Sequence, residues 1–210
     1  MKKFIYLISP NKIYNSFYND LDEVLSSKKI KFFQLRLKNK KDNEIIKISK
    51  KIKKITLKHK VKLIINDNYK IVKKINADGC HLGQADGSIE KARILLKGKI
   101  LGATCHNSKK LCKLALKSRV NYIALGSFFN SKLKPNAIKA KLDLLKWAKK
   151  NIKKKIVAIG GVNNKNFKKL LVRGANYIAI SSYIWNNPSL KPVEAIKKIK
   201  RKLVQTKLRS

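Results

Sequence analysis

The sequence predicts a single-domain (β/α)8 barrel, an α/β fold in which eight parallel strands alternate with helices. Eight short apolar runs rich in Ile, Val, Phe and Tyr recur at nearly even intervals. Most of these runs are continuous rather than alternating, as expected for parallel strands that are covered on both faces. Segments with apolar residues at helical spacing fill the stretches between the runs, so strand and helix alternate about eight times.

The predicted strands lie at 4–8, 31–37, 61–66, 79–82, 99–103, 121–126, 155–159 and 176–180. Between the second and third strands, isoleucines at 45, 46, 48, 52 and 55 form an apolar stripe with lysines opposite. Similar helical patterns cover 89–96, 111–116, 142–148, 167–171 and 193–203. Ser88 and Asn107 are predicted N-caps, and Gly98 and Gly174 follow helices as C-terminal glycines do.

An open, doubly wound sheet would share this alternation of strands and helices. Eight strands in one domain, with no G-x-G-x-x-G segment after the first strand, favour the closed barrel. The 210 residues are therefore expected to form one domain over 1–210. The last ~6 residues are expected to be a frayed tail.

The composition favours a protein of the reducing cytoplasm. The first apolar run is too short for a signal peptide and ends without a small-residue cleavage site. No apolar stretch reaches the ~18 residues that a membrane span requires. Cys80, Cys105 and Cys112 are odd in number and lack C-x-x-C spacing, so neither a disulfide framework nor a zinc site is expected.

The formal net charge of +41 would attract polyanions, and nucleic-acid or anionic-membrane binding is one interpretation. Arginine, which suits the bidentate reading of bases and phosphates, supplies only 6 of the 52 basic residues. The lysines are spread along the whole chain, mostly on predicted helix faces. We therefore interpret the charge as a solvated surface, and expect non-specific polyanion binding but no specific nucleic acid and no membrane partner.

Two aspartates stand out because the chain has only 11 acidic residues. Asp67 directly follows the third strand, and Asp86 lies in the loop after the fourth, at the end of the barrel where catalytic groups collect. Mg2+ takes one or two carboxylates and completes its coordination with water and substrate phosphate. The pair therefore predicts a magnesium site, although Asp67 could also serve as a helix N-cap.

The second strand predicts cations at the same end of the barrel. Gln34, Arg36 and Lys38 alternate, so their side chains share one face of the strand end. If that face points inward, two cations enter the barrel mouth, where an anionic ligand would compensate them. Lys38 could instead reach solvent. Lys134, in the long loop after the sixth strand, would add a third cation.

The last two strand ends predict a phosphate site. Gly160-Gly161 allows backbone amides to approach an anion closely, and Ser181-Ser182 adds hydroxyls and amides near a helix start. The loops after the seventh and eighth strands are the usual phosphate site of this fold. A tight turn would require the two glycines as well, so the alternative is purely structural.

Some polar residues fall inside the predicted strands. His81 is expected to be a hydrogen-bonded core residue, whereas His106 follows the fifth strand and could contact a ligand. Tyr6, Tyr122 and Tyr177 lie on strands, where core packing explains them. A nucleic-acid-binding protein would instead need aromatics interleaved with a basic patch, or a recognisable module.

Four segments together resemble the thiamine phosphate synthase family: QLRLK at 34–38, IND at 65–67, ADGCHLGQAD at 77–86 and AIGGV at 158–162. The resemblance runs from about residue 4 to 184, and the combination of QLR-x-K with HLGQ-x-D is specific. It implies a (β/α)8 barrel and a magnesium-dependent transferase. Such an enzyme joins a hydroxymethylpyrimidine diphosphate to a thiazole phosphate by dissociative substitution, which yields thiamine phosphate and pyrophosphate.

By matching motif, the resemblance implies that Asp67 and Asp86 hold magnesium. It places the pyrimidine diphosphate among Gln34, Arg36, Lys38, Asn66, Thr104 and Lys134. It places the thiazole phosphate among Ser131, Gly161, Ser181 and Ser182. Of these residues, the catalytic ones are expected to be Arg36, Lys38, Thr104 and Lys134. A monomer or a small homo-oligomer is expected.

The chain departs from the family pattern in two places. Thr104 stands where the family usually has Ser. The loop after the sixth strand usually reads G-P-x-F-P-T-x-T-K, whereas 126–134 reads GSFFNSKLK, so that one hydroxyl is lost at Leu133. The related thiazole tautomerases usually lack the two aspartates and carry a histidine where Ser127 stands. The aspartates therefore favour the synthase over a tautomerase, and the specific motifs favour it over a barrel enzyme for sugar phosphates.

Overall fold

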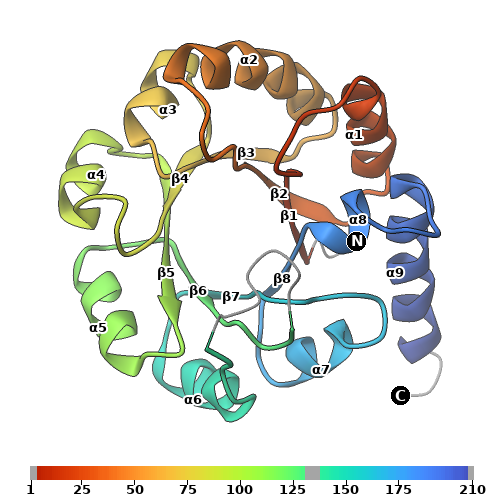
Figure 1. Cartoon of the computed structure of the whole chain (residues 1–210). Helices are drawn as coiled ribbons and strands as arrows, with labels where there is room; N and C mark the ends of the chain where they lie inside the picture. The colour runs from red at the N-terminus through yellow and green to blue at the C-terminus, as the bar shows by residue number, and fades with distance from the viewer. Residues whose placement is uncertain (1–3, 131–137, 208–210) are drawn as a thin grey trace.

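Eight parallel strands close into a barrel in chain order in the computed structural model, which describes residues 4–130 and 138–207 (Figure 1). Strand β1 (Ile5–Ile8) pairs with both β2 (Ile30–Leu35) and β8 (Tyr177–Ile180), and this double pairing closes the barrel. The other strands are β3 (Lys62–Asn66), β4 (Gly79–Leu82), β5 (Ile100–His106), β6 (Tyr122–Leu125) and β7 (Lys155–Ala158). The predicted (β/α)8 architecture is confirmed.

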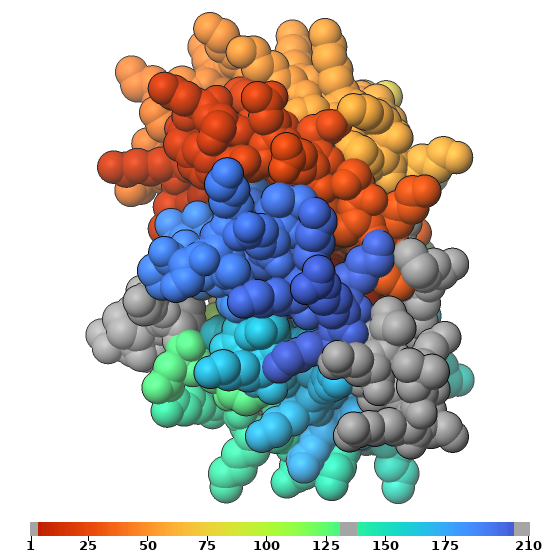
Figure 2. All heavy atoms as spheres, turned by 90° about the vertical axis from the view of Figure 1, so that its right-hand side faces the viewer, coloured from red at the N-terminus to blue at the C-terminus, as the bar shows by residue number. Residues whose placement is uncertain are grey.

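Helices surround the strands as an outer ring (Figure 1). They are α1 (Phe17–Leu25), α2 (Asp42–Lys58), α3 (Tyr69–Ile75), α4 (Ile89–Leu95), α5 (Lys109–Lys117), α6 (Asp143–Asn151), α7 (Phe167–Val172), α8 (Ser182–Trp185) and α9 (Pro192–Lys207). Figure 2 shows the blue C-terminal elements α8 and α9 between the red N-terminal part of the chain and the light-blue α7, and α9 contacts α1 and α8. The predicted tail over about the last six residues overlaps the end of α9 and the undescribed residues 208–210. Along the described residues, no helix is both long and apolar enough to cross a membrane.

The predicted capping residues at the helix ends are confirmed with one exception. The Ser88 side chain accepts a hydrogen bond from the Lys91 amide and caps α4, as predicted. Asn107 was wrong as the cap of α5, because the next residue, Ser108, accepts from the Leu111 amide. A serine hydroxyl on that residue reaches the free amides of the first turn, and Asn107 lies one position too early. Gly174 has φ 112° behind α7, which confirms its role after the helix end.

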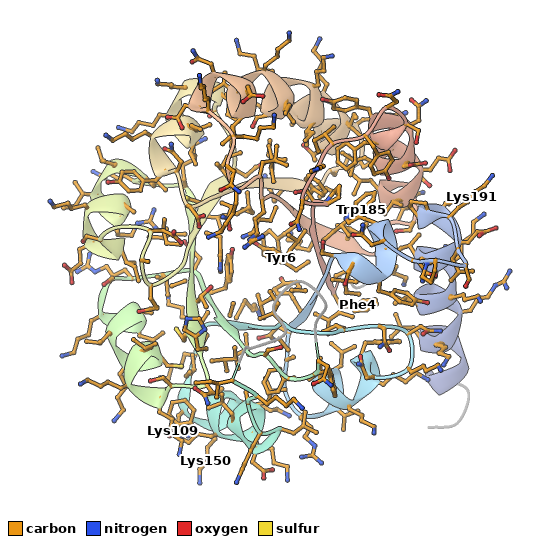
Figure 3. The ribbon with its side chains drawn as sticks, viewed as in Figure 1. Phe4, Tyr6, Lys109, Lys150, Trp185 and Lys191 are labelled. Carbon is orange, nitrogen blue, oxygen red and sulfur yellow. The ribbon has the colours of Figure 1, made fainter. Side chains whose placement is uncertain are left out.

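The side chains of the strands alternate between two cores. Residues such as Leu7, Phe33 and Leu63 point outward and pack under the helices. Their neighbours point into the barrel, where the inner core consists of Tyr6, Ile8, Phe32, Ile64, Tyr122, Ala124, Val157 and Ala179. Figure 3 shows Tyr6 inside the ring of strands, while Lys109, Lys150 and Lys191 lie on its outer rim. On each strand, the next inward-pointing residue lies two positions further along, at the mouth of the barrel.

Two strand lengths differ from prediction in ways that affect the mouth. Strand β2 ends at Leu35, so Arg36 and Lys38 lie beyond it in the connecting segment rather than on the strand. Strand β5 continues to His106, so Thr104 belongs to a strand and not to a loop. The three cysteines, Cys80, Cys105 and Cys112, are buried free thiols.

Candidate active site

A cavity of about 220 Å³ opens at the carboxyl ends of the strands. Most of the predicted site residues line it: Gln34, Arg36, Lys38, Asn66, Asp67, Asp86, Thr104, Gly161, Ser181 and Ser182. Two further predicted residues, Ser131 and Lys134, lie outside the described residues. The cavity therefore brings together side chains that are up to about 150 residues apart in the chain, as the barrel topology requires.

Strand alternation places four of these side chains. Gln34 lies two residues beyond Phe32, Asn66 two beyond Ile64, and Ser181 two beyond Ala179, and each of the earlier residues belongs to the inner core. Thr104 has the inward parity of β5, whose neighbours Ala103 and Cys105 pack in the outer core. Because side chains alternate with period two, the inward row continues from the apolar core into the polar mouth.

Ser9, the residue that follows β1, anchors the basic segment after β2. Ser9, which is 2% exposed, donates its amide to the Gln34 carbonyl at 2.9 Å, and its hydroxyl accepts from the Arg36 amide at 3.0 Å. Ser181 donates its hydroxyl to the Ser9 carbonyl at 3.0 Å. Sequence reasoning missed Ser9 and the neighbouring cavity residue Asn11, although considering the residues that follow the first strand would have found both.

Asp67 and Asp86 lie next to each other in the cavity, close enough for each carboxyl group to shift the pKa of the other. Burial and the Asp86 carboxyl raise the pKa of Asp67 to about 6, against the opposing pull of Lys38 and Arg36. Burial alone would raise the pKa of Asp86 too, but the neighbouring Asp67 carboxyl and a hydrogen bond from the Gly83 amide lower it. Two carboxyl groups in such contact favour either a shared proton or a bound cation.

The backbone around Asp67 directs its side chain into the cavity. Its amide donates to the His81 carbonyl at 2.8 Å, and its φ of +63° turns the chain away from β3. Helix α3 is capped by the next residue, Asn68, whose side chain accepts from the amides of Lys70 and Ile71. The alternative role of Asp67 as an N-cap is therefore wrong, and its carboxylate is left for the cavity.

The paired carboxylates fit a magnesium ion by their chemistry. Oxygen ligands of this kind suit a hard cation, and a cation would offset the burial and the Asp86 charge that raise the pKa of Asp67. Among residues 4–130 and 138–207, no group of three or more His, Cys, Asp or Glu side chains forms a fuller ligand set. Lys38, whose Nζ lies 3.7 Å from Asp67 Oδ2, stands beside the pair.

The glycine turn after β7 lies on the cavity wall. Gly160 and Gly161 have φ of +106° and +58°, and a Cβ on either would overlap the segment after β6, at Ser127 and at Asn130 respectively. A tight turn was the structural explanation for these two glycines, and the turn does require them. They also line the cavity, together with Ser181 and Ser182 at the start of α8.

His81 is buried and hydrogen-bonded, as predicted, but it also lines the cavity. Its Nε2 lies 2.8 Å from Thr104 Oγ1 and its Nδ1 lies 3.0 Å from Tyr122 Oη. His106 lines the cavity as well, in keeping with the expectation that it could contact a ligand. Ser127, the position at which tautomerases carry histidine, belongs to the same lining.

Known proteins resemble this chain over most of its length. The profile of the family described as thiamine monophosphate synthase matches residues 5–184. A thiamine-phosphate synthase of Pelagibacter ubique (strain HTCC1062) is 56% identical over 200 residues, which cover 95% of this chain and 97% of the relative. One of Erythrobacter litoralis (strain HTCC2594) is 34% identical over 196 residues, covering 91% and 92% of the two chains.

The solved structure of a thiamine phosphate pyrophosphorylase from Pyrococcus furiosus superposes with a TM-score of 0.85. It covers 96% of this chain and 96% of that one, at 24% identity, and so supports the fold. The family profile and the two relatives carry the assignment further, because they span nearly all of the barrel. The chain belongs to the thiamine monophosphate synthase family.

Proposed function

We propose that this barrel is a transferase with thiamine-phosphate synthase activity, and that the cavity at the strand ends is where it joins a pyrimidine diphosphate to a thiazole phosphate. Family membership and the 56% identical relative carry the activity. One observation supports the location: the Asp67–Asp86 pair lies beside Lys38 in the cavity whose lining includes Gly161 and Ser181. Two phosphorylated substrates would need two binding regions. One would hold the diphosphate with a metal ion and cationic side chains, and the other would hold the single phosphate.

The pyrimidine diphosphate belongs on the side of β2 to β5. Arg36 and Lys38 supply positive charge for the diphosphate, and Gln34, Asn66 and Thr104 offer hydrogen bonds to the pyrimidine. Lys134 is proposed as a further cation from the segment outside the described residues. Asp67 and Asp86 would hold magnesium, which when bound neutralises negative charge on the diphosphate.

The thiazole phosphate belongs on the side of β7 and β8. Gly161, Ser181 and Ser182 surround this part of the cavity, and the short helix α8 begins there. Ser131 is proposed to contribute from outside the described residues. The loss of a hydroxyl at Leu133 falls in the same segment and affects this side of the reaction.

The chemistry requires no covalent enzyme nucleophile. The bond between the pyrimidine methylene carbon and the diphosphate oxygen breaks, and its electron pair leaves with pyrophosphate. The electron-rich aminopyrimidine stabilises the positive charge left on the methylene carbon. The lone pair of the thiazole nitrogen then forms the new carbon–nitrogen bond. Arg36 and Lys38 stabilise the charge that develops on the leaving group, and the cavity holds the two partners close together.

A thiazole tautomerase is the nearest alternative. The presence of Asp67 and Asp86 side by side argues against it. A basic nucleic-acid-binding protein is the alternative from another class of function. Such a protein would have no use for a cavity that combines two carboxylates with two cations. We propose a monomer or a small homo-oligomer in a reducing cytoplasmic setting, which suits the buried free thiols.

The test is a coupling assay with the purified protein, both substrates and magnesium. We expect thiamine phosphate and pyrophosphate in equal amounts, and loss of product when a chelator removes the metal. Purified, folded protein that forms no thiamine phosphate under these conditions would contradict the proposal. Isomerisation of the thiazole without coupling would favour the tautomerase.

A further inference from the structure

A chain of hydrogen bonds runs from the middle of the barrel to the cavity. Tyr6 Oη lies 2.7 Å from Tyr122 Oη, Tyr122 Oη lies 3.0 Å from His81 Nδ1, and His81 Nε2 lies 2.8 Å from Thr104 Oγ1. The two tyrosines are 2% exposed and His81 is 9% exposed, so water competes little for these groups. Thr104 alone reaches the cavity with a hydroxyl that can turn toward a ligand.

The bonds can all run in the same sense along the chain in two directions. In the first, Tyr6 donates to Tyr122, Tyr122 donates to His81 Nδ1, and His81 Nε2–H donates to Thr104. In the second, every bond is reversed, and the Tyr6 hydroxyl is left to find another acceptor. A mixed arrangement, in which Tyr122 accepts from both Tyr6 and His81, would leave the buried Tyr122 proton without an acceptor. Among the described residues, Tyr122 is the one hydrogen-bond partner of Tyr6 Oη. A buried hydroxyl without an acceptor is costly, so the first direction is favoured.

We propose that His81 is a positioning residue: it donates from Nε2 to Thr104, and thereby makes the Thr104 hydroxyl a hydrogen-bond donor to an acceptor atom of the bound pyrimidine diphosphate. This rests on the proposed function for the identity of the ligand. In the favoured direction the lone pair of Thr104 that faces His81 is already used. Its proton therefore points to the cavity, where a ring nitrogen or a diphosphate oxygen would accept it.

The surroundings hold this arrangement in place. His81 is only 9% exposed, and burial disfavours a charged imidazolium, so its ring has one donor and one acceptor nitrogen. The His81 and Tyr122 rings stack at 13° with centroids 5.6 Å apart. Gly102 makes room for Tyr122, because a Cβ there would overlap the tyrosine ring. The Gln84 side chain donates to the Thr104 carbonyl and fixes the backbone beside the hydroxyl.

The direction of the chain can be measured without any ligand. A long-range 1H–15N spectrum of the imidazoles distinguishes a ring protonated at Nε2 from one protonated at Nδ1. The protein has 3 histidines, and the His81→Gln variant assigns the signal of His81 by its absence. We expect the Nε2–H tautomer at neutral pH. An Nδ1–H tautomer would overturn the proposal.

A double-mutant cycle tests whether His81 acts through Thr104. Thr104→Val keeps the shape but removes the donor, and should lower kcat/KM for the pyrimidine diphosphate about tenfold, as for one lost hydrogen bond. His81→Leu should lower it several-fold, with the KM of the thiazole phosphate unchanged. In the Thr104→Val background, His81→Leu should have almost no further effect on kcat/KM. His81→Gln, whose amide can donate toward Thr104, should recover most of the loss.

A general defect of the barrel core would behave differently. Phe32→Leu opens the inner core beside Tyr6 and Tyr122 without removing a hydrogen bond, and serves as the matched control. It should lower the melting temperature and leave the KM for the pyrimidine diphosphate unchanged. Equal losses from His81→Leu in both backgrounds would overturn the proposal. If the wild-type protein makes no thiamine phosphate, the proposed function fails, while the imidazole spectrum still decides the direction of the chain.

Discussion

Asp67 shows how a single residue is shaped for its site. Its φ of +63° is a conformation that aspartate and asparagine adopt more readily than other residues with a side chain. The same turn leaves Asn68 to cap α3 and brings the Asp67 carboxyl against Asp86. Each feature alone has a structural explanation. Together they produce two half-buried carboxyl groups side by side, which a fold would have little reason to maintain without a cation.

Replacing either carboxylate should remove activity while leaving the barrel intact. We expect Asp67→Asn and Asp86→Asn each to lower kcat/KM about a hundredfold or more, because metal-assisted charge stabilisation is lost. Asparagine tolerates the positive φ of Asp67, so the melting temperature should change little. Asp143→Asn, at an aspartate whose side chain is 77% exposed on α6, is the matched control and should behave like the wild type. Near-normal turnover in both site variants would exclude the metal role.

Protons should compete with magnesium for the carboxyl pair. The pKa of Asp67 is raised from 3.8 to about 6 in the fold, so the folded chain binds this proton more tightly than the unfolded chain. The stability that this proton supplies is lost as the pH rises through that interval, and a bound cation should restore it. We expect magnesium with pyrophosphate to raise the melting temperature more at about pH 8 than at about pH 5. The difference should be smaller in Asp67→Asn, where only the protonation of pyrophosphate remains, and an equal difference in that variant and the wild type would contradict this prediction.

Turns between elements hold the two sides of the cavity together. The connection from β7 to α7 passes through Gly160 and Gly161, which pack against the segment that follows β6. Asn166 donates its side chain to the Gly161 carbonyl at 2.9 Å and closes the turn from the helix side. The wall of the cavity at this point consists of backbone, so it depends on the absence of side chains.

A pair of glycine variants separates backbone strain from packing. Gly98 has φ +78° and open space where a Cβ would lie, whereas Gly160 has φ +106° and a Cβ there would overlap Ser127. Gly98→Ala should cost about 1–2 kcal/mol of unfolding free energy from strain alone. Gly160→Ala should cost clearly more and also reduce turnover, because the β6 segment must move. Urea unfolding and the coupling assay measure both effects, and equal costs would show that the β6 segment yields freely.

In the whole molecule, most of the positive charge lies on the outer surface, away from the cavity. Lys109, Lys150 and Lys191 lie on the outer rim, far from Tyr6 in the barrel interior (Figure 3). Most of the described lysines lie on the outer helices and the segments that connect them, whereas the cavity sets Arg36 and Lys38 against two carboxylates. The net charge of +41 is therefore mainly a property of the surface. Lysines also contact aromatic rings there, as Lys109 does with its Nζ 5.3 Å from the centroid of the Trp147 ring.

Binding to DNA should accordingly be electrostatic and unselective. We expect duplexes of different sequence to bind equally, with affinity falling steeply between about 50 and 200 mM salt. Fluorescence anisotropy at several salt concentrations checks this, and an uncharged polymer in place of DNA provides the control. Submicromolar binding of one sequence at high salt, combined with no turnover, would favour the nucleic-acid alternative.

The sequence by itself determined the order of strands and helices, the polar residues that follow the strands, and the family. These follow from periodicity and from local motifs, which are written in consecutive residues. Only the tertiary structure decided that Ser108 rather than Asn107 caps α5, that Asp67 touches Asp86, and that Tyr6, Tyr122, His81 and Thr104 form one chain of hydrogen bonds. Such contacts join residues from different strands, and their distances are set by the closure and register of the barrel.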